Sequence, residues 1–392
     1  MMQGRAATAG QCEGLSDTSL NCVNTPDIPK FRVTAGQRVK MRLINHGGDS
    51  TQRFGIDGHK LTVIANDFVQ VKPYQTDFVT VAVGQRTDIV FEATGNPGDM
   101  FWMRAQVVFC PPSLTKQVEM RGALYYDGAD TNAEPTTSQT ADANLTNCQN
   151  VSCLLLLQHR HIPAKRLNSS SNAPTLQDDL KITKPYYPMP LEEPDTQIQF
   201  FTFFTINDKL EYRFTMNTQL ENVVQLGRHF YQGNYSSPIL RDAQSGGAAQ
   251  TFEQKSRLYD FGTNRTVRVV VNNPFIIQNM HPMHLHGHDI QLLATGDGLW
   301  DGKTLETENP IRRDTVMMPL NGHVVFQYTL DNPGIWSLHC HIPWHLADGL
   351  LVNFMERPDE IKAQDAQIPE IMQETCDSWN AQRPNLSVPD EN

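Results

Sequence analysis

The sequence has no Cys-x-x-Cys pair, no long apolar run and no excess of positive charge. Seven of its 392 residues are cysteine, and no two of them are spaced as Cys-x-x-Cys. The longest apolar segments, such as Cys153–Leu157, are far shorter than the roughly 20 residues of a membrane-spanning helix. The formal net charge of −11 disfavours nucleic acid or an anionic membrane as a partner. These absences predict a soluble globular protein that binds neither.

The N-terminus also lacks a signal peptide, since Met1–Arg5 is followed by no apolar stretch. Either the protein is not secreted or its true N-terminus is missing. Six Asn-x-Ser/Thr sequences and the cysteines suggest an oxidising, extracellular context, because such sites accept N-linked glycans in secreted proteins. The six are Asn144, Asn150, Asn168, Asn234, Asn264 and Asn385. In that compartment we expect a disulfide between Cys110 and Cys148, with other pairings open. We also expect the protein to be a monomer.

Short segments separated by turn residues indicate an all-β fold. Glycines such as Gly36 and Gly84 interrupt runs rich in β-branched and aromatic residues, a texture typical of antiparallel sandwiches or barrels. The predicted strands are Lys30–Val33, Val39–Ile44, Leu61–Ile64, Phe78–Val83, Thr87–Glu92, Gln197–Ile206, Val267–Asn272 and Val324–Leu330. A helix is expected within Ile361–Cys376.

The segment around residues 160 to 190 is rich in proline, serine, asparagine and aspartate, which is typical of a linker or a long surface connection. We therefore predict three parts: a β-sandwich domain over residues 1–160, a linker over 161–190, and a second β-sandwich domain with a tail over 191–392.

Seven of the 13 histidines lie in two short runs of the second domain. The first run is His281-Pro-Met-His284-Leu-His286-Gly-His288, and the second is His339-Cys340-His341-Ile-Pro-Trp-His345. The other histidines are scattered, and we expect them to lie on the surface or in the packing. The two runs are therefore the candidates for chemistry.

Strand geometry gives the second run two faces. Side chains alternate along a strand, so His339 and His341 point one way and Cys340 points the other way. A thiolate with two imidazoles and a weak axial neighbour is the ligand set of a blue-copper electron-transfer site. The alternatives are a buried cysteine between core histidines, a disulfide partner, or half of a zinc site. The last usually needs paired cysteines, which His341 and His345 lack here.

The first run complements the second. His284 and His286 share a strand face in the same way, so the two pairs can converge on one multinuclear site. His281 precedes Pro282, and a kink there would turn it towards Cys340. We expect His288 to be a core or supporting histidine and not a ligand.

These runs resemble the last two copper-binding signatures of the multicopper oxidases, His-Pro-x-His-x-His-Gly-His and His-Cys-His-x-x-x-His-x-x-x-Gly-Leu. Further segments resemble fungal laccases of the ascomycete type, and the resemblance covers nearly the whole chain. These segments are Ile56–Ile64, Val83–Asp88, Phe101–Arg104, Asn309–Val316 and Gly334–Trp336. The resemblance implies two cupredoxin-like Greek-key domains, the second and third of a three-domain oxidase.

The resemblance also implies a complete type 1 copper site, held by His281, Cys340 and His345 with Leu350 in the axial position. The outward edge of His345 would accept an electron, and Cys340 would pass it on. A non-ligating Leu350 in place of methionine raises the reduction potential, which suits phenols and aromatic amines.

For the other coppers the resemblance implies His284 on a type 2 copper, and His286, His339 and His341 on a type 3 pair. The family's first domain supplies the other half of this cluster through His-x-His-Gly and Trp-x-x-His-x-His motifs, and neither motif occurs in this sequence. The type 2 and type 3 sites are thus expected to be half-complete, and the chain to be a truncated form of the family's pattern.

The function implied is one-electron oxidation of phenolic or aromatic donors, coupled to four-electron reduction of dioxygen to water. The alternatives are a copper-binding pair of domains that transfers electrons without reducing dioxygen, an inactive relic, and a ferroxidase. Asp67, by resemblance of position, is the candidate proton acceptor near His345, although a solvated turn residue is an equal alternative.

Overall fold

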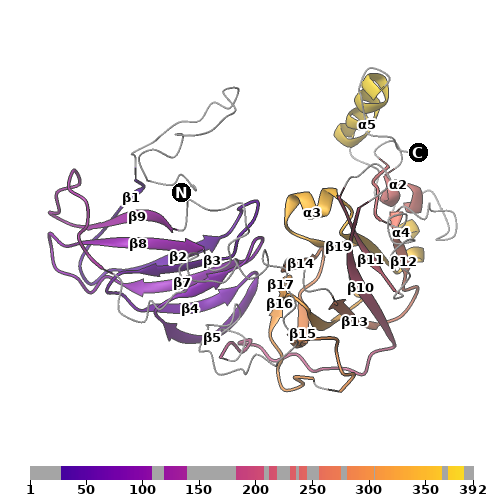
Figure 1. The fold of residues 1–392 in the computed structure, drawn as a ribbon, viewed down its shortest axis with the longest axis horizontal. Helices are drawn as coiled ribbons and strands as arrows, with labels where there is room; N and C mark the ends of the chain where they lie inside the picture. The colour runs from indigo at the N-terminus through magenta and orange to yellow at the C-terminus, as the bar shows by residue number, and fades with distance from the viewer. Residues whose placement is uncertain are drawn as a thin grey trace, which may run out of the picture. The chain divides into compact units, whose positions relative to one another are not determined.

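A computed structural model describes residues 28–107, 119–138, 182–206, 212–218, 230–234, 238–244, 256–274, 280–303, 305–363 and 370–383. The chain divides into two compact units, Met1–Tyr187 and Pro188–Asn392. Each unit consists of stacked β-sheets (Figure 1), and the prediction of an all-β fold is confirmed. The limits 1–160, 161–190 and 191–392 stay predictions, because most of the proposed linker lies outside the described residues.

The first unit contains a five-stranded sheet, in the order β1-β9-β8-β3-β6, and a four-stranded sheet, in the order β2-β7-β4-β5. Neighbouring strands are often distant in sequence, as Greek-key connections require. The strands are β1 (Lys30–Val33), β2 (Arg38–Ile44), β3 (Gln52–Ile56), β4 (Leu61–Asn66), β5 (Val69–Thr76), β6 (Val79–Val81), β7 (Arg86–Glu92), β8 (Met100–Val107) and β9 (Glu119–Tyr126).

A buried ionic network joins strands β8 and β9 of this unit's larger sheet to the segments that follow β3 and β9. Arg104 on β8 is 8% exposed, and its Nε lies 3.0 Å from Asp57 Oδ1. Its Nη1 lies 2.8 Å from Glu119 Oε1 on β9, and its Nη2 donates to the Thr137 carbonyl at 3.0 Å. Because these donors are paired with carboxylates and a carbonyl, the guanidinium can remain buried.

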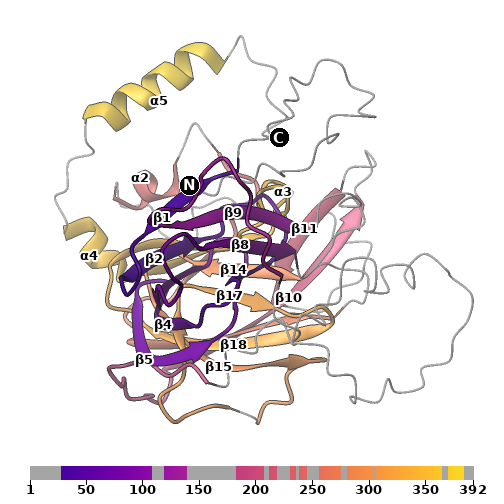
Figure 2. The same cartoon turned by 90° about the vertical axis from the view of Figure 1, so that its left-hand side faces the viewer.

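The second unit contains a six-stranded sheet, β11-β10-β13-β18-β15-β16, and a five-stranded sheet, β12-β20-β19-β14-β17. Figure 2 shows β14, β17 and β18 running across the unit. The strands are β10 (Thr196–Ile206), β11 (Tyr212–Asn217), β12 (Leu258–Asp260), β13 (Thr266–Asn273), β14 (His281–Leu285), β15 (Ile290–Asp297), β16 (Arg312–Arg313), β17 (Thr315–Met318), β18 (Gly322–Thr329), β19 (Gly334–Cys340) and β20 (Leu351–Glu356). The described helices are α2 (Ile239–Gln244), α3 (Pro343–Ala347), α4 (Pro358–Ala363) and α5 (Glu370–Gln382).

The helix predicted within Ile361–Cys376 has different limits in the structure. Helix α4 begins three residues earlier, at Pro358, and α5 continues to Gln382, with residues 364–369 outside the described part. The predicted Cys110–Cys148 disulfide also falls on residues that are not described. Among the described residues no helix is long and apolar enough to cross a membrane.

Substituting Arg104 by alanine should strongly destabilise the first unit, because the buried Asp57 carboxylate would lose its charged partner. We expect a loss of about 3–5 kcal/mol in the free energy of unfolding, measured by chemical denaturation. Arg121→Ala is the control, since that half-exposed arginine meets Glu119 from the solvent side, and it should cost less than about 1 kcal/mol. Equal losses of unfolding free energy in Arg104→Ala and Arg121→Ala would contradict the stabilising role assigned to the buried Arg104–Asp57 pair.

Candidate metal centre

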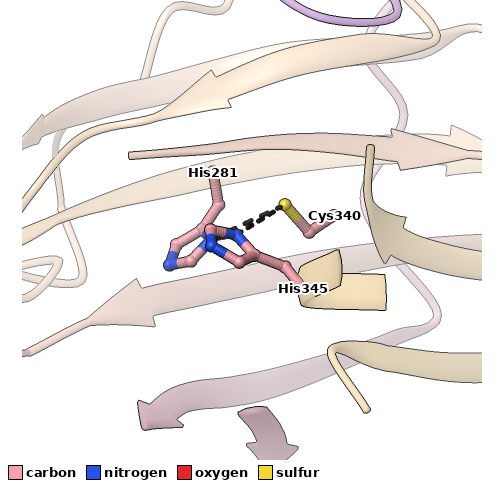
Figure 3. Close-up of side chains that lie close together, drawn as sticks. All are labelled: His281, Cys340 and His345. Atoms are coloured by element: carbon pink, nitrogen blue, oxygen red, sulfur yellow. Dashed lines mark hydrogen bonds between the residues drawn. The ribbon is translucent and has the colours of Figure 1, made fainter. Parts of the chain in front are cut away.

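Three side chains converge inside the second unit, and Figure 3 shows the Cys340 sulfur facing the two imidazoles of His281 and His345. The Nδ1 atoms of His281 and His345 lie 3.1 Å apart. Cys340 Sγ lies 3.6 Å from the first nitrogen and 3.5 Å from the second. All three residues are buried, with exposures of 0%, 0% and 1%. We call these residues the triad.

The pairing of β14 with β19 explains why His281 and Cys340 meet. Met283 lies directly opposite Cys340 in the antiparallel ladder. Residues opposite one another share a face, and His281 is two residues from Met283, so it lies on that same face. The predicted kink at Pro282 is wrong: β14 runs unbroken from His281 to Leu285, and alternation alone turns His281 towards the cysteine.

A short helix brings the third member back to the strand. The backbone of Ile342 is extended, and Pro343 occupies the first turn of α3, where its missing N–H is not needed. His345 follows within that turn. The chain then closes on β19, because the Cys340 N–H donates to the carbonyl of Leu350 at 3.1 Å. Leu350 is fully buried at this closure, next in sequence to β20.

The donor atoms of the triad fit a metal ion. A point equidistant from the three atoms lies about 2 Å from each, close to the lengths of metal bonds to imidazole nitrogen and thiolate sulfur. Burial lowers the pKa of His281 well below 6.5 and that of His345 to about 4, so both imidazoles are neutral. Neutral imidazoles and one thiolate are the donors that a soft transition metal prefers.

Four more imidazoles gather on the opposite face of the same strands. His284 lies directly opposite His339 in the ladder. The ring centroids of His284 and His286 are 4.8 Å apart, and those of His286 and His339 are 5.1 Å apart. The ring of His341 lies 5.7 Å from that of His284. We call these four residues the imidazole cluster.

Backbone carbonyls select the tautomers of this cluster. His284 Nδ1 donates to the carbonyl of Asp314 at 2.9 Å, and His339 Nδ1 donates to the carbonyl of Cys340 at 2.8 Å. Each ring therefore keeps a free lone pair on Nε2, the arrangement found in metal-binding histidines. The Nε2 atoms of His286 and His339 face each other at 2.9 Å, and burial lowers the pKa of both. The cluster thus presents converging acceptor atoms.

The strand faces predicted for this cluster are right only in part. β14 ends at Leu285 and β19 ends at Cys340, so His286 and His341 lie just beyond the strands. His286 reaches the cluster through the turn that follows β14. Period-two alternation accounts for His284 and His339, and loop geometry accounts for the other two.

Phe214 on β11 is a site residue that the sequence did not reveal. Its ring centroid lies 4.2 Å from that of His345 and 5.7 Å from that of His281. The prediction that one edge of His345 faces outward is therefore wrong, because His345 is 1% exposed. Its neighbour Trp344 is 47% exposed. An isolated phenylalanine in a strand carries no sequence signal for such a role.

Asp67, the predicted proton acceptor, lies in the turn between β4 and β5. Its Oδ1 accepts the N–H of Arg86 at 2.9 Å and lies 3.5 Å from the Arg86 guanidinium. The carboxylate is fully buried against this residue. Because Asp67 belongs to the first unit and His345 to the second, its role beside His345 stays a prediction.

The neutral histidines should make the metal-free chain sensitive to acid. Their pKa values in the folded state lie below 6.5, so the unfolded chain binds more protons as the pH falls from 6.5 towards about 4. We expect the melting temperature to fall across that interval. In His345→Gln it should fall less steeply with pH. A melting temperature that does not change with pH would contradict the buried, neutral state.

Comparison with known proteins gives two matches to the same family. Models of the family described as multicopper oxidase match residues 4–129 and residues 216–360. The oxidoreductase OpS5 of Beauveria bassiana is 35% identical over 92% of this chain, which spans 55% of that protein. Laccase-1 of Botryotinia fuckeliana is 29% identical over 92% of this chain, which spans 57% of it.

A solved structure agrees with these matches. The laccase from Botrytis aclada superimposes with a TM-score of 0.75 and 26% identity, covering 97% of this chain and 62% of the laccase. The chain thus spans a little more than half the length of the relatives that it matches. The two family matches together cover more than half of the chain and include the triad, so the chain belongs to the multicopper oxidase family.

Proposed function

We propose that this chain carries the copper sites of a laccase-like oxidase, which oxidises phenolic or aromatic donors and reduces dioxygen to water. One observation carries the proposal: Cys340 joins the triad on one face of β19, and the adjacent His339 joins the imidazole cluster on the other face. When bound, copper would supply one-electron chemistry at the triad and dioxygen reduction at the cluster.

The chain's own contribution is a short covalent path between the two sites. From Cys340 Sγ the path runs through one peptide unit to the ring of His339. The fully buried triad excludes water, and a low-dielectric surrounding reduces the reorganisation that accompanies a change of charge. The resemblance would place Leu350 beside the metal, and its side chain has no donor atom, which would favour a high reduction potential and hence phenols as donors.

Around His345 the chain provides aromatic contacts. Phe214 covers the imidazole, and the ring of Trp344 lies 6.2 Å from it while remaining about half exposed. We infer that an electron from an aromatic donor crosses this layer to reach the triad. Asp67 remains the candidate for accepting the donor's phenolic proton.

A second function is favoured by the composition of the cluster. The described residues supply four imidazoles on the face opposite the triad, whereas the resemblance implies that a complete cluster takes eight. A chain with this half alone would bind copper and transfer electrons without reducing dioxygen. The expected secretion, glycans and disulfide stay predictions. Of the asparagines concerned, the structure describes Asn234 and Asn264.

Copper loading tests the triad directly. We expect the chain to bind copper and to show the intense visible absorption of a thiolate–copper bond, because the donor set is a thiolate with two imidazoles. Cys340→Ser should abolish that absorption. Cys376→Ser is the matched control and should leave it unchanged, since Cys376 lies on α5 and outside the triad. A colourless chain without bound copper would overturn the proposal.

Anaerobic reduction followed by air separates the two functions. Hydroquinone should bleach the blue absorption, and dioxygen should restore it through the imidazole cluster in the unmodified chain. His286→Phe, which removes one acceptor atom of the cluster, should bleach normally and recover much more slowly. If the unmodified chain also stays bleached in air, the electron-transfer function holds instead.

A further inference from the structure

A buried hydrogen-bonded pair, His288 and Glu356, joins the turn after β14 to the end of β20. His288 Nε2 lies 2.7 Å from Glu356 Oε1, and the two side chains are 4% and 1% exposed. The second carboxylate oxygen, Oε2, is buried and has no hydrogen-bond partner in the described part of the chain. Asp331, which is 70% exposed, lies 3.8 Å from His288 Nδ1. None of the proposed chemistry uses this pair.

Stability alone does not account for the pair. Burial removes water from both polar groups, and apolar residues of similar volume often stabilise a protein equally or better. The surroundings would accept such residues, because His288 packs 4.7 Å from the ring of Tyr328 and 6.1 Å from that of Trp336. What the hydrogen bond adds over an apolar contact is a defined direction and distance.

The pair is one of three contacts that hold the turn bearing His286. The His286 N–H donates to the Ser337 carbonyl on β19 at 3.0 Å. Asn332 Nδ2 donates to the Gly287 carbonyl at 3.1 Å. The hydrogen bond to Glu356 then anchors the next residue, His288. Of the three contacts, this one joins two side chains. Three consecutive residues are thus attached to the β18–β20 part of the sheets.

The other end of the pair belongs to the frame of the cluster. Glu356 is the last residue of β20 and lies opposite Gly334 at the start of β19. The same strand, β19, carries His339 near its other end. A link from His288 to Glu356 therefore connects the turn of His286 to the sheet that positions His339.

We propose that His288 and Glu356 are positioning residues that hold His286 in place against His339, so that the two Nε2 atoms remain 2.9 Å apart. The pair thereby sets the metal affinity of the imidazole cluster and leaves the triad, on the other face, unaffected. The inference rests on the proposed function in that it takes the cluster as a copper site.

The sharpest test replaces both polar side chains at once in the full chain, with His288→Leu and Glu356→Met. We expect the double variant to fold with an undiminished melting temperature, because neither partner is left buried without the other. Its affinity for Cu²⁺ at the colourless cluster should fall about 10- to 100-fold, the usual effect of losing a residue that orients a ligand. The blue absorption of the triad should stay unchanged. A copper titration followed by visible absorption and electron paramagnetic resonance resolves the two sites.

A single substitution and a metal-free measurement complete the test. Glu356→Gln keeps an oxygen acceptor for His288 and should retain most of the affinity, whether or not the double variant folds. In the metal-free double variant, hydrogen exchange at the His286 amide should accelerate. Asp331→Asn is the matched control and should change neither quantity, because Asp331 is exposed.

Two results would overturn the positioning role: copper affinity at the cluster equal to that of the unmodified chain, or an equal loss at the triad and the cluster. An unmodified chain that binds no copper would instead overturn the proposed function. In that case unchanged hydrogen exchange at His286 would still reject the role of the pair, and faster exchange would support it.

Discussion

The constraint on which the site depends is the alternation of side chains along two hydrogen-bonded strands. β14 and β19 pair with Met283 opposite Cys340 and with His284 opposite His339. Opposite residues share a face of the sheet and successive residues do not. Neighbouring positions of one strand therefore supply a thiolate to one site and an imidazole to another. The single peptide unit between them is the shortest covalent connection that a chain can provide between two such sites.

Packing around these strands decides the chemical state of the ligands. Burial keeps the imidazoles of His281 and His345 neutral, and a neutral ring is what a metal ion requires. Backbone carbonyls then leave Nε2 as the free nitrogen of His284 and His339, whereas in the triad the Nδ1 atoms of His281 and His345 face each other and Cys340. The same sheet thus offers two kinds of site from one residue type, because the surroundings of each ring differ.

Much of the β pattern can be predicted because alternating apolar residues report directly on which face is buried. The predicted strands Lys30–Val33 and Gln197–Ile206 agree with β1 and β10 to within one residue. The ends of the histidine-bearing strands were less predictable. Alternation carries no information on where a ladder of hydrogen bonds stops, so the positions of His286 and His341 in turns came only from the structure.

The sequence by itself determined the all-β class, because strand alternation is a local property of the chain, and the resemblance of its two histidine runs implied the residues of the triad. Only the tertiary structure decided that Phe214 covers His345, and that His288 pairs with Glu356, a residue 68 positions away. The physical reason is that such contacts depend on which distant segments pack together. The energies of these contacts come from burial and from hydrogen-bond geometry where distant segments meet, and no local pattern of residues predicts either.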